Sequence, residues 1–514
     1  MNVLLISPDT PNTFWSLKYA LDVISKQAAL PPLGLLTIAA MLPRDWQLKL
    51  ADMNVAPLKN QDIQWADMVF IGAMHIQRSS ANRIIRKCKH LGKTIVAGGP
   101  LFTAIPDEYE TVDHLVLDEA EITLPRFLDD LAAGSPKHVY RAQAARADMH
   151  SSPIPRYDII DMKPYALASV QYSRGCPWDC EFCNITALFG RKYRTKTSQQ
   201  VIAELDNIYN SGWRGNVFFV DDNFIGQKAI LKRDILPAII KWRRTRKYPF
   251  YFNTQASIDM ADDQELMNLM TQAGFNCVFI GIETPSQENL DECSKTQNKD
   301  RDLVECVKKI QRSGIEVQGG FILGFDHDNQ GSFDALIDFI QKSGIIAAMV
   351  GLLNAPHGTR LYDRLAGQGR LKPYVSGDNT DFTINFETIM PRIQLLKGYE
   401  NVIQTIYSHK NYYDRIMTFL NTYKPVASSH IRLSFSDIKT FARSIWFIGI
   451  KDPGRKYYWK AIFQALRRPR CFSIIVAFTI KGLHYRKTFE DLRPNLKYLN
   501  KNCSPAERSE TITT

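Results

Sequence analysis

Two series of short apolar segments, each segment followed by a helical pattern, run through the first 365 residues. The strands expected in the first series are 3–7, 48–51, 68–72, 94–97 and 114–117. Those expected in the second series are 167–173, 217–221, 249–254, 277–282, 316–323 and 345–353. Strands and helices that alternate at this spacing predict α/β architecture, with parallel sheets covered by helices. Ligands of such sheets bind at the carboxyl ends of the strands.

The pattern predicts four segments in the 514 residues. Residues 1–135 are expected to form a doubly wound, Rossmann-like domain. Residues 136–165 lack periodicity and carry four prolines, so we interpret them as a linker. Residues 166–365 hold six βα units without a clear seventh or eighth, which predicts a partial (βα)6 TIM barrel. Residues 366–514 are predicted to form a mostly helical, basic domain, with helices near 395–410 and 436–447 and a disordered tail.

The first strand does not lead into the glycine pattern of a nicotinamide-binding domain. That pattern, Gly-x-Gly-x-x-Gly, lets a backbone approach a pyrophosphate. Here the strand leads into Ser7-Pro8-Asp9-Thr10. The sequence therefore argues against a bound dinucleotide and leaves open what occupies this sheet edge.

Three of the nine cysteines, Cys176, Cys180 and Cys183, lie within eight residues directly after the first barrel strand. This crowding and the odd total favour a metal or redox site over a disulfide framework. Three thiolates can hold three irons of a [4Fe–4S] cluster and leave the fourth iron open, although such clusters normally take four cysteines. Structural zinc usually shows two pairs of ligands, and a ferredoxin site would need a fourth cysteine, the next being Cys277. The spacing alone leaves these alternatives open, and the position at a strand end favours the open cluster.

The cysteine spacing, with Phe182 before the last cysteine, resembles the signature of the radical S-adenosylmethionine superfamily. Gly281-Ile-Glu283, the stretch from Gly320 to Gly324, and the loop from Asn354 to Tyr362 resemble later motifs of that family in the same order, with Arg360 replacing a usual proline. The resemblance implies a [4Fe–4S] cluster on the three cysteines. It also implies S-adenosylmethionine on Gly281, Glu283, Gly320, Gly324, Asn354 and Pro356. Residues 221–224, Asp-Asp-Asn-Phe, recur in this branch, with capping of the next helix as the alternative role.

The N-terminal domain resembles that of the cobalamin-binding branch. The residues that this resemblance assigns to cobalamin are Asp52, Asn54, Gly98, Gly99 and Glu119. Cobalamin domains of mutases carry a cobalt-ligating histidine where this chain has Asn54, and an amide is a poor cobalt ligand. We therefore expect a lower cobalt face that is bound by water or unligated. His75 is a second candidate ligand, although a single histidine is more often a hydrogen-bonded or surface residue.

The whole chain is closest to the hopanoid methylase-like subgroup, which shares Thr13-Phe14-Trp15-Ser16 and Asp52-Met53-Asn54-Val55. The resemblance implies a cobalamin-dependent radical S-adenosylmethionine C-methyltransferase, in which a 5′-deoxyadenosyl radical abstracts hydrogen from an unactivated carbon of a hopanoid, another lipid or a small molecule. Methylcobalamin then supplies the methyl group, and a flavodoxin- or ferredoxin-type protein supplies electrons. No catalytic side chain is assigned.

Three other functions remain open at this stage. An oxidoreductase or cyclase would use the same cofactors without methyl transfer. A tRNA methylthiotransferase would need three further N-terminal cysteines, and only Cys88 precedes the cluster motif. A non-enzymatic cobalamin sensor would carry a vestigial cluster site.

Positive charge is concentrated at the C-terminal end. Residues 401–514 contain 20 Lys and Arg against 7 Asp and Glu, whereas the first 400 residues contain 44 against 46. The stretch 451–460, which contains Arg455-Lys-Tyr-Tyr-Trp-Lys460, and then Arg467-Arg468-Pro-Arg470 precede the apolar run 471–480, which is too short to span a bilayer. This amphipathic, aromatic and basic segment is expected either to form a buried helix with a basic rim or to lie among lipid headgroups. No RNA-binding module is apparent, so we expect no nucleic-acid partner, and a cytoplasmic protein with peripheral contact at the inner membrane face.

Overall fold

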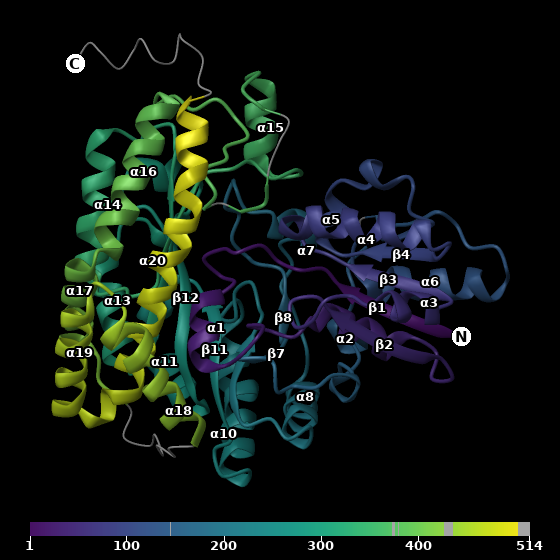
Figure 1. The fold of residues 1–514 in the computed structure, drawn as a ribbon, viewed down its shortest axis with the longest axis horizontal. Coiled ribbons are helices and arrows are strands. Elements are labelled where there is room, and N and C mark those ends of the chain that lie inside the picture. The colour runs from purple at the N-terminus through teal and green to yellow at the C-terminus, as the bar shows by residue number, and fades with distance from the viewer. Residues whose placement is uncertain (144, 373–375, 379, 426–434, 502–514) are drawn as a thin grey trace. The chain divides into compact units, whose positions relative to one another are not determined.

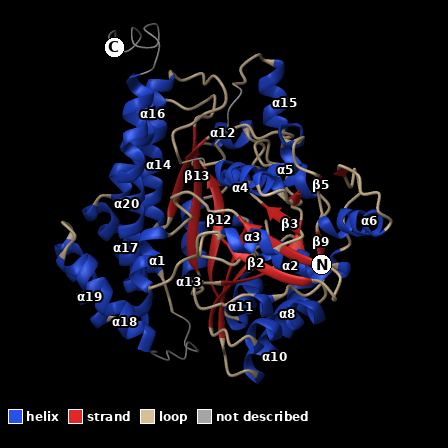
Figure 2. Cartoon of the chain, turned by 45° about the vertical axis from the view of Figure 1, so that its right-hand side comes forward, coloured by secondary structure: helices blue, strands red, loops and turns tan. Residues whose placement is uncertain are grey.

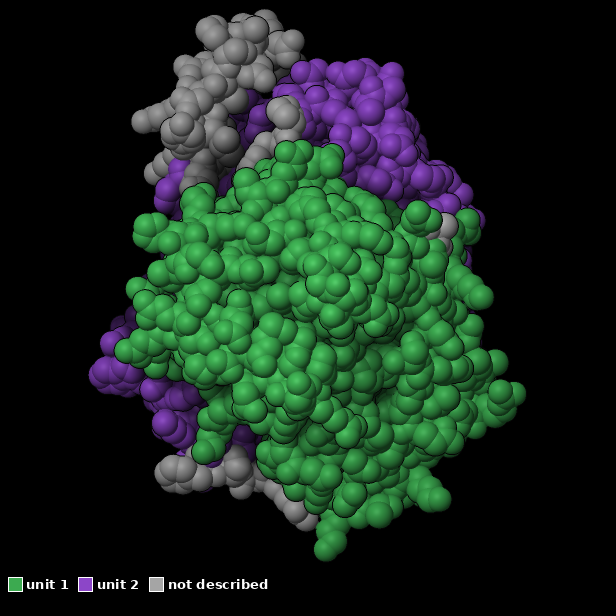
Figure 3. All heavy atoms as spheres, turned by 90° about the vertical axis from the view of Figure 1, so that its right-hand side faces the viewer, with its two compact units in different colours: residues 1–11, 27–177, 184–251 green, residues 12–26, 178–183, 252–514 purple. Residues whose placement is uncertain are grey.

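The computed structural model describes residues 1–143, 145–372, 376–378, 380–425 and 435–501 (Figure 1). The chain divides into two compact units (Figure 3). Unit 1 comprises residues 1–11, 27–177 and 184–251, and unit 2 comprises residues 12–26, 178–183 and 252–514. The short segments 12–26 and 178–183 therefore pack with a part of the chain that is distant in sequence.

Unit 1 contains a parallel sheet of six strands in the order β2-β1-β3-β4-β5-β6. The strands are β1 (Asn2–Ser7), β2 (Gln47–Asp52), β3 (Met68–Gly72), β4 (Thr94–Gly98), β5 (His114–Val116) and β6 (Val139–Tyr140). The five expected strands are confirmed. The sixth, β6, was not expected, because its two residues lie in the segment interpreted as a linker. It pairs with β5 in parallel register.

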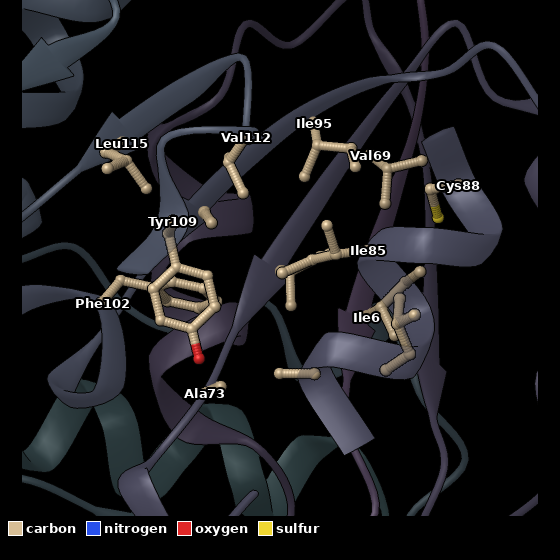
Figure 4. Packing of buried hydrophobic residues seen from close by; sticks show 14 of the residues in the cluster. Ile6, Val69, Ala73, Ile85, Cys88, Ile95, Phe102, Tyr109, Val112 and Leu115 are labelled. Carbon is tan, nitrogen blue, oxygen red and sulfur yellow. The ribbon is translucent and has the colours of Figure 1, made fainter. Parts of the chain in front are cut away.

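The inner strands β1, β3 and β4 are buried on both faces, which explains why they read as continuous apolar runs, whereas the edge strand β2 alternates. Leu4 and Ile6 of β1 pack on one face with α4 (Arg78–His90), whereas Val3 and Leu5 pack on the other with α2 (Leu33–Met41) and α6 (Ala120–Ala132). Figure 4 shows the first of these two clusters. Each large side chain buried in this way contributes about 1.5–3 kcal/mol.

The remainder of unit 1 contains the strands on either side of the first cysteine, Cys176, and the helices that follow it. β10 (Gly215–Phe219) pairs with β7 (Ala168–Val170) in parallel, and β8 (Ser173–Arg174) pairs with β9 (Arg194–Thr195) in antiparallel register. The expected strand 167–173 is thus split into β7 and β8. The other helices of unit 1 are α3 (Asn60–Trp65), α5 (Pro100–Ala104), α7 (Ile185–Phe189), α8 (Ser198–Asn210), α9 (Lys228–Ile230) and α10 (Leu236–Thr245).

Unit 2 continues the second series of strands. These are β11 (Phe250–Ala256, with residues 252–256 in this unit), β12 (Phe275–Glu283), β13 (Glu316–Leu323) and β14 (Ala348–Leu352), each parallel to the next. The helices after them are α11 (Gln264–Ala273), α12 (Gln287–Glu292), α13 (Leu303–Arg312), α14 (Gln330–Ser343) and α15 (Arg360–Gly367). Local signals set their ends: Asp263 caps α11 by accepting from the Leu266 N–H, and Gly274 ends it with φ +99°. All six strands expected for the barrel are present.

The C-terminal part of unit 2 is helical, as predicted (Figure 2). Its helices are α16 (Arg392–Tyr407), α17 (His409–Thr422), α18 (Phe435–Ser444), the π-helical segment η8 (Ile445–Ile450), α19 (Arg455–Arg467) and α20 (Phe472–Lys501). The helix expected over 395–410 ends earlier, because Ser408 leaves the helical conformation and caps α17. The predicted tail at 502–514 lies outside the described residues.

An N-terminal helix contributes to the core of this helical region. Ala20 and Val23 of α1 (Lys18–Ile24) are buried in one cluster with Ile462 of α19 and with Val476 and Ile480 of α20. The apolar run at the start of α20 is therefore buried, as the first of the two sequence alternatives predicted. No helix within the described residues is long and apolar enough to cross a membrane.

Candidate cofactor sites

Asp52 and Asn54 hold two loops together at the carboxyl edge of the first sheet in unit 1. The buried Asp52 accepts hydrogen bonds from Asn54 Nδ2 at 2.8 Å and from the Tyr165 hydroxyl at 2.9 Å. Asn54 Oδ1 accepts from the Thr10 N–H at 2.9 Å, and Asn54 Nδ2 also donates to the Pro8 carbonyl at 3.2 Å. The amide that replaces the cobalt-ligating histidine is thus committed to holding the loop after β1.

Gly98 and Gly99 permit a close backbone approach at the end of β4. A Cβ on Gly98 would lie 2.6 Å from the Val116 carbonyl oxygen. Gly99 has φ +96°, which side chains rarely adopt, and its Cβ would lie 3.0 Å from the Ala73 carbonyl oxygen. The two glycines therefore shape the same sheet edge as Asp52 and Asn54.

Glu119 lies at the centre of a buried ion cluster. Its Oε2 accepts from Arg174 at 3.0 Å and from Arg194 at 2.9 Å, and its Oε1 accepts from the Ala147 N–H at 3.3 Å. Glu121 completes the cluster through two further bonds to Arg174. Burial raises the pKa of Glu121, but the Arg174 guanidinium outweighs burial, and the pKa lies below its ordinary value. The cluster connects the first sheet to Arg174, two residues before the first cysteine of the motif.

The loop after β10 holds the peptide that leads to Cys176. Asp221 is fully buried and accepts hydrogen bonds from the Ser173 N–H and hydroxyl and from the Tyr172 N–H. Burial raises the pKa of Asp221 to about 7. Asn223 Nδ2 lies 4.0 Å from Cys176 Sγ, within reach of an N–H···S contact. Asp221 therefore positions the strand before the first cysteine, rather than serving as a helix cap.

In unit 2, the cysteine loop is fastened by side chains from later in the chain. Gln297 Nε2 donates to Cys180 Sγ at 3.7 Å, and the Glu181 N–H donates to the Cys293 carbonyl at 2.9 Å. Arg364 of α15 makes a bidentate ion pair with Glu181 at 2.8 and 2.9 Å. Arg360, the departure from the family motif, donates to the Asp179 carbonyl at 2.5 Å.

Glu283 and Lys295 form a buried ion pair at the end of β12, with Lys295 Nζ 2.7 Å from Glu283 Oε1. Burial by itself would lower the pKa of Lys295, but Glu283 and the thiols of Cys180 and Cys183 raise it above its ordinary value. A positive charge thus lies close to two of the motif cysteines. A Cβ on Gly281 would lie 2.3 Å from Glu283 Oε1 and 2.9 Å from Lys295 Nζ, so a larger residue there would displace this ion pair.

Of the remaining residues assigned to S-adenosylmethionine, Gly320 lies within β13, and Gly324, Asn354 and Pro356 follow the ends of β13 and β14. Gly320 is paired in register with Gly281, and Gly324 follows β13 with φ +107°. Asn354 donates to the Thr383 carbonyl at 3.2 Å and accepts from the Asn385 N–H at 3.2 Å. Pro356 lies in the same loop, where its carbonyl accepts from Thr359. The structure thus gives Asn354 a role in holding its own loop.

Comparisons with known proteins match the chain in three consecutive stretches. The B12 binding domain matches residues 21–128, the radical SAM superfamily matches residues 170–340, and a domain of unknown function (DUF4070) matches residues 359–497. An uncharacterized methyltransferase of Synechocystis sp. is 39% identical over 502 residues, covering 96% of this chain and 93% of the relative. A hopanoid C-2 methylase of Rhodopseudomonas palustris is 33% identical over 491 residues, covering 93% and 92%. The chain belongs to the cobalamin-binding radical S-adenosylmethionine (SAM) family.

The fold of this radical SAM protein agrees with that assignment. It is similar to the cobalamin-dependent S-adenosylmethionine radical enzyme OxsB, with a TM-score of 0.61 at 14% identity, over 99% of this chain and 83% of that chain. The protein is an enzyme of the cobalamin-dependent radical SAM methyltransferase class. Its cofactors are a [4Fe–4S] cluster, S-adenosylmethionine and cobalamin.

The residues of the radical SAM protein fit these cofactors. None of the three motif cysteines forms a disulfide, and Gln297 and Asn223 direct amide N–H groups at two of their sulfurs, as donors to thiolate clusters do. Gln297 Oε1 and Asn298 Oδ1 are buried and have no hydrogen-bond partner in the part of the chain that the structure describes. Among the described residues, no three His, Cys, Asp or Glu side chains lie close enough together to hold a metal ion. The ligand roles of the individual residues stay predictions.

Sequence reasoning missed Arg174, Lys295, Gln297 and Arg364, which belong to none of the recognised motifs and whose charged or sulfur partners lie between 12 and 183 residues away in the chain. Only Arg174 gave a local signal, because it stands two residues before Cys176. His75, the alternative cobalt ligand, lies directly after β3 in the short helix His75–Gln77, and its role stays a prediction.

Proposed function

We propose that this enzyme methylates an unactivated carbon of a polycyclic lipid of the hopanoid class. The observation that supports the substrate class is 33% identity to a hopanoid C-2 methylase over nearly the full length of both chains. Saturated lipid carbons carry no acidic or nucleophilic group, so their methylation requires radical chemistry that only cofactors provide. The cofactors, when bound, supply a 5′-deoxyadenosyl radical that removes hydrogen and a cobalt-borne methyl group that replaces it.

In this proposal the residues of the chain hold and shield the cofactors. Cys176, Cys180 and Cys183 hold the cluster, and Glu283 with the glycine cradle at Gly281 orients S-adenosylmethionine. Lys295 pairs with the Glu283 carboxylate and offsets the negative charge of the thiolates. The sheet edge with Asn54, Gly98 and Gly99 holds cobalamin, and Glu119 positions Arg174 rather than contacting the corrin.

The reaction has a stoichiometry that separates it from its rivals. Each methylated product consumes two S-adenosylmethionine molecules, one giving 5′-deoxyadenosine and methionine and the other giving S-adenosylhomocysteine. Two electrons from a flavodoxin- or ferredoxin-type donor balance the cycle. An oxidase or cyclase would form 5′-deoxyadenosine without a matching amount of S-adenosylhomocysteine.

The test is anaerobic turnover of reconstituted enzyme with a hopanoid such as diploptene, with both nucleoside products quantified. We expect equal amounts of the two and a lipid heavier by one CH₂. Replacement of all three motif cysteines by alanine should abolish iron binding and 5′-deoxyadenosine formation, whereas Cys306→Ala on α13 should retain both. Formation of 5′-deoxyadenosine without S-adenosylhomocysteine, or retention of it by the triple variant, would overturn the proposal.

A further inference from the structure

One stretch of the helical region exposes an unusual number of large apolar side chains. Six of the thirteen most exposed large apolar side chains within the described residues lie between residues 438 and 466. They are Ile438, Trp446, Ile450, Trp459, Phe463 and Leu466, and we call them the α18–α19 surface. Single exposed apolar residues are ordinary, but a concentrated set on one element marks an interaction site.

The positions of these residues follow the helical period. Trp446 and Ile450 are four residues apart on η8, and Ile438 lies eight residues before Trp446 on α18. Trp459, Phe463 and Leu466 are spaced by four and three residues, which places them on one face of α19. The opposite face of α19 is buried, with Ile462 in the core of the helical region. The helix thus carries apolar residues on its exposed face as well as on its buried face.

The two parts of the surface adjoin. Trp459 Nε1 donates to the Gly449 carbonyl at 3.0 Å, next to Ile450. The only polar atom of the indole is therefore satisfied inside the protein, while 46% of the residue is exposed. The indole N–H makes no hydrogen bond to water, so moving the exposed ring into an apolar environment breaks no hydrogen bond with water.

The surroundings of the surface are strongly basic. Between residues 437 and 470 the acidic residues are Asp437 and Asp452, and Asp452 is buried and paired with His409 and Arg486. The nine basic residues of that stretch are Lys439, Arg443, Lys451, Arg455, Lys456, Lys460, Arg467, Arg468 and Arg470. Several lie beside the aromatic rings, with Lys451 Nζ 4.9 Å from the Trp446 ring and Arg467 Cζ 4.2 Å from the Phe463 ring.

We propose that the α18–α19 surface docks the protein on an anionic lipid membrane. Indole rings with adjacent cations are suited to the headgroup region, where the apolar ring enters the boundary of the acyl chains and the cation meets lipid phosphate. The excess of positive charge selects anionic lipid over a second copy of this chain, which would place like charges together. The membrane contact thus lies on residues 438–466, which include the basic, aromatic stretch 451–460 of the sequence expectation, and not on the run 471–480, which is buried. This inference does not depend on the substrate.

The test uses the full-length protein and sedimentation with vesicles of phosphatidylcholine, alone or with 30% phosphatidylglycerol. We expect binding to the anionic vesicles and a blue-shifted tryptophan emission. Each cation near anionic lipid contributes about a fivefold change in partitioning. Replacement of Lys456, Lys460 and Arg467 by glutamine should therefore weaken binding about a hundredfold.

Two control variants keep the test specific. Replacement of Lys241, Arg244 and Lys247 by glutamine removes the same charge from exposed positions elsewhere and should leave binding within fivefold. Phe463→Glu should abolish binding, whereas Ile389→Glu, at an equally exposed site, should not. Far-UV circular dichroism verifies that each variant is folded. Absence of vesicle binding at 50 mM salt, equal loss in the two charge variants, or a concentration-dependent dimer that Phe463→Glu dissociates would overturn the proposal.

Discussion

Glu119→Gln separates a role in the ion cluster from a role in cofactor binding. The Glu119 side chain is 1% exposed, and its two partners, Arg174 and Arg194, are 12% and 10% exposed. Removing one partner of such a buried pair costs about 3–5 kcal/mol, because a charge is left without compensation. Glu121 still pairs with Arg174 in the variant, so we expect the lower end, about 3 kcal/mol.

The assay is urea unfolding of cobalamin-free protein, followed by circular dichroism. At an m-value of about 2 kcal/mol per molar urea, the midpoint of the variant should fall by about 1.5 M. Glu108→Gln is the matched control, because Glu108 pairs with Arg78 at the surface and an exposed pair contributes less than about 1 kcal/mol. The reasoning is refuted if Glu119→Gln is as stable as the control but binds hydroxocobalamin more weakly, since Glu119 would then be a cofactor contact.

Three further predictions follow from other contacts. Burial lowers the pKa of His484 to about 4, so between pH 6.5 and 4 the unfolded chain takes up a proton that the folded chain does not. The free energy of unfolding should therefore fall by about 3 kcal/mol on acidification through that range, and urea titrations of His484→Gln should show a flatter dependence. Gln297→Leu removes the N–H donor to Cys180 and should lower the reduction potential of the cluster by about 40 mV, the equivalent of about 1 kcal/mol for one electron. A redox titration followed by electron paramagnetic resonance measures this shift, and an unchanged potential contradicts the contact. Gly99→Ala should lower the free energy of unfolding by about 2 kcal/mol, more than Gly134→Ala, where φ is also positive but the space is open.

The sequence predicted the inner strands β1, β3 and β4 well because they are buried on both faces. The bounds of β3 and β13, Met68–Gly72 and Glu316–Leu323, are those expected. A short segment of this length between turns is typical of a buried strand. The sequence also placed the candidate site residues at strand ends, because parallel topology puts loops there. It did not predict that the helix 18–24 packs on α20, because that contact depends on matching surfaces 450 residues apart rather than on local pattern.

The sequence also did not predict which residues pair with the buried charges. Glu119 was assigned to cobalamin on its place in a family pattern, and the structure shows its oxygens bonded to Arg174, Arg194 and a backbone N–H. A burial requirement explains this: a carboxylate without water needs several donors, and no sequence spacing identifies which arginines supply them. Motif resemblance therefore indicates a region without resolving which residues touch a cofactor and which hold those that do, and the cofactor contacts stay predictions.

Asn54, which stands where related domains have a cobalt-ligating histidine, holds the loop after β1 by hydrogen bonds. Asn54 uses one acceptor and two donors at once, to the Thr10 N–H, the Pro8 carbonyl and the Asp52 carboxylate. A neutral imidazole offers one donor and one acceptor, so a histidine at this position could not make all three bonds. It would have to release the loop after β1 in order to reach a metal. The side chain best able to fasten this edge of the sheet is thus also one that leaves the lower cobalt face to another ligand or to none.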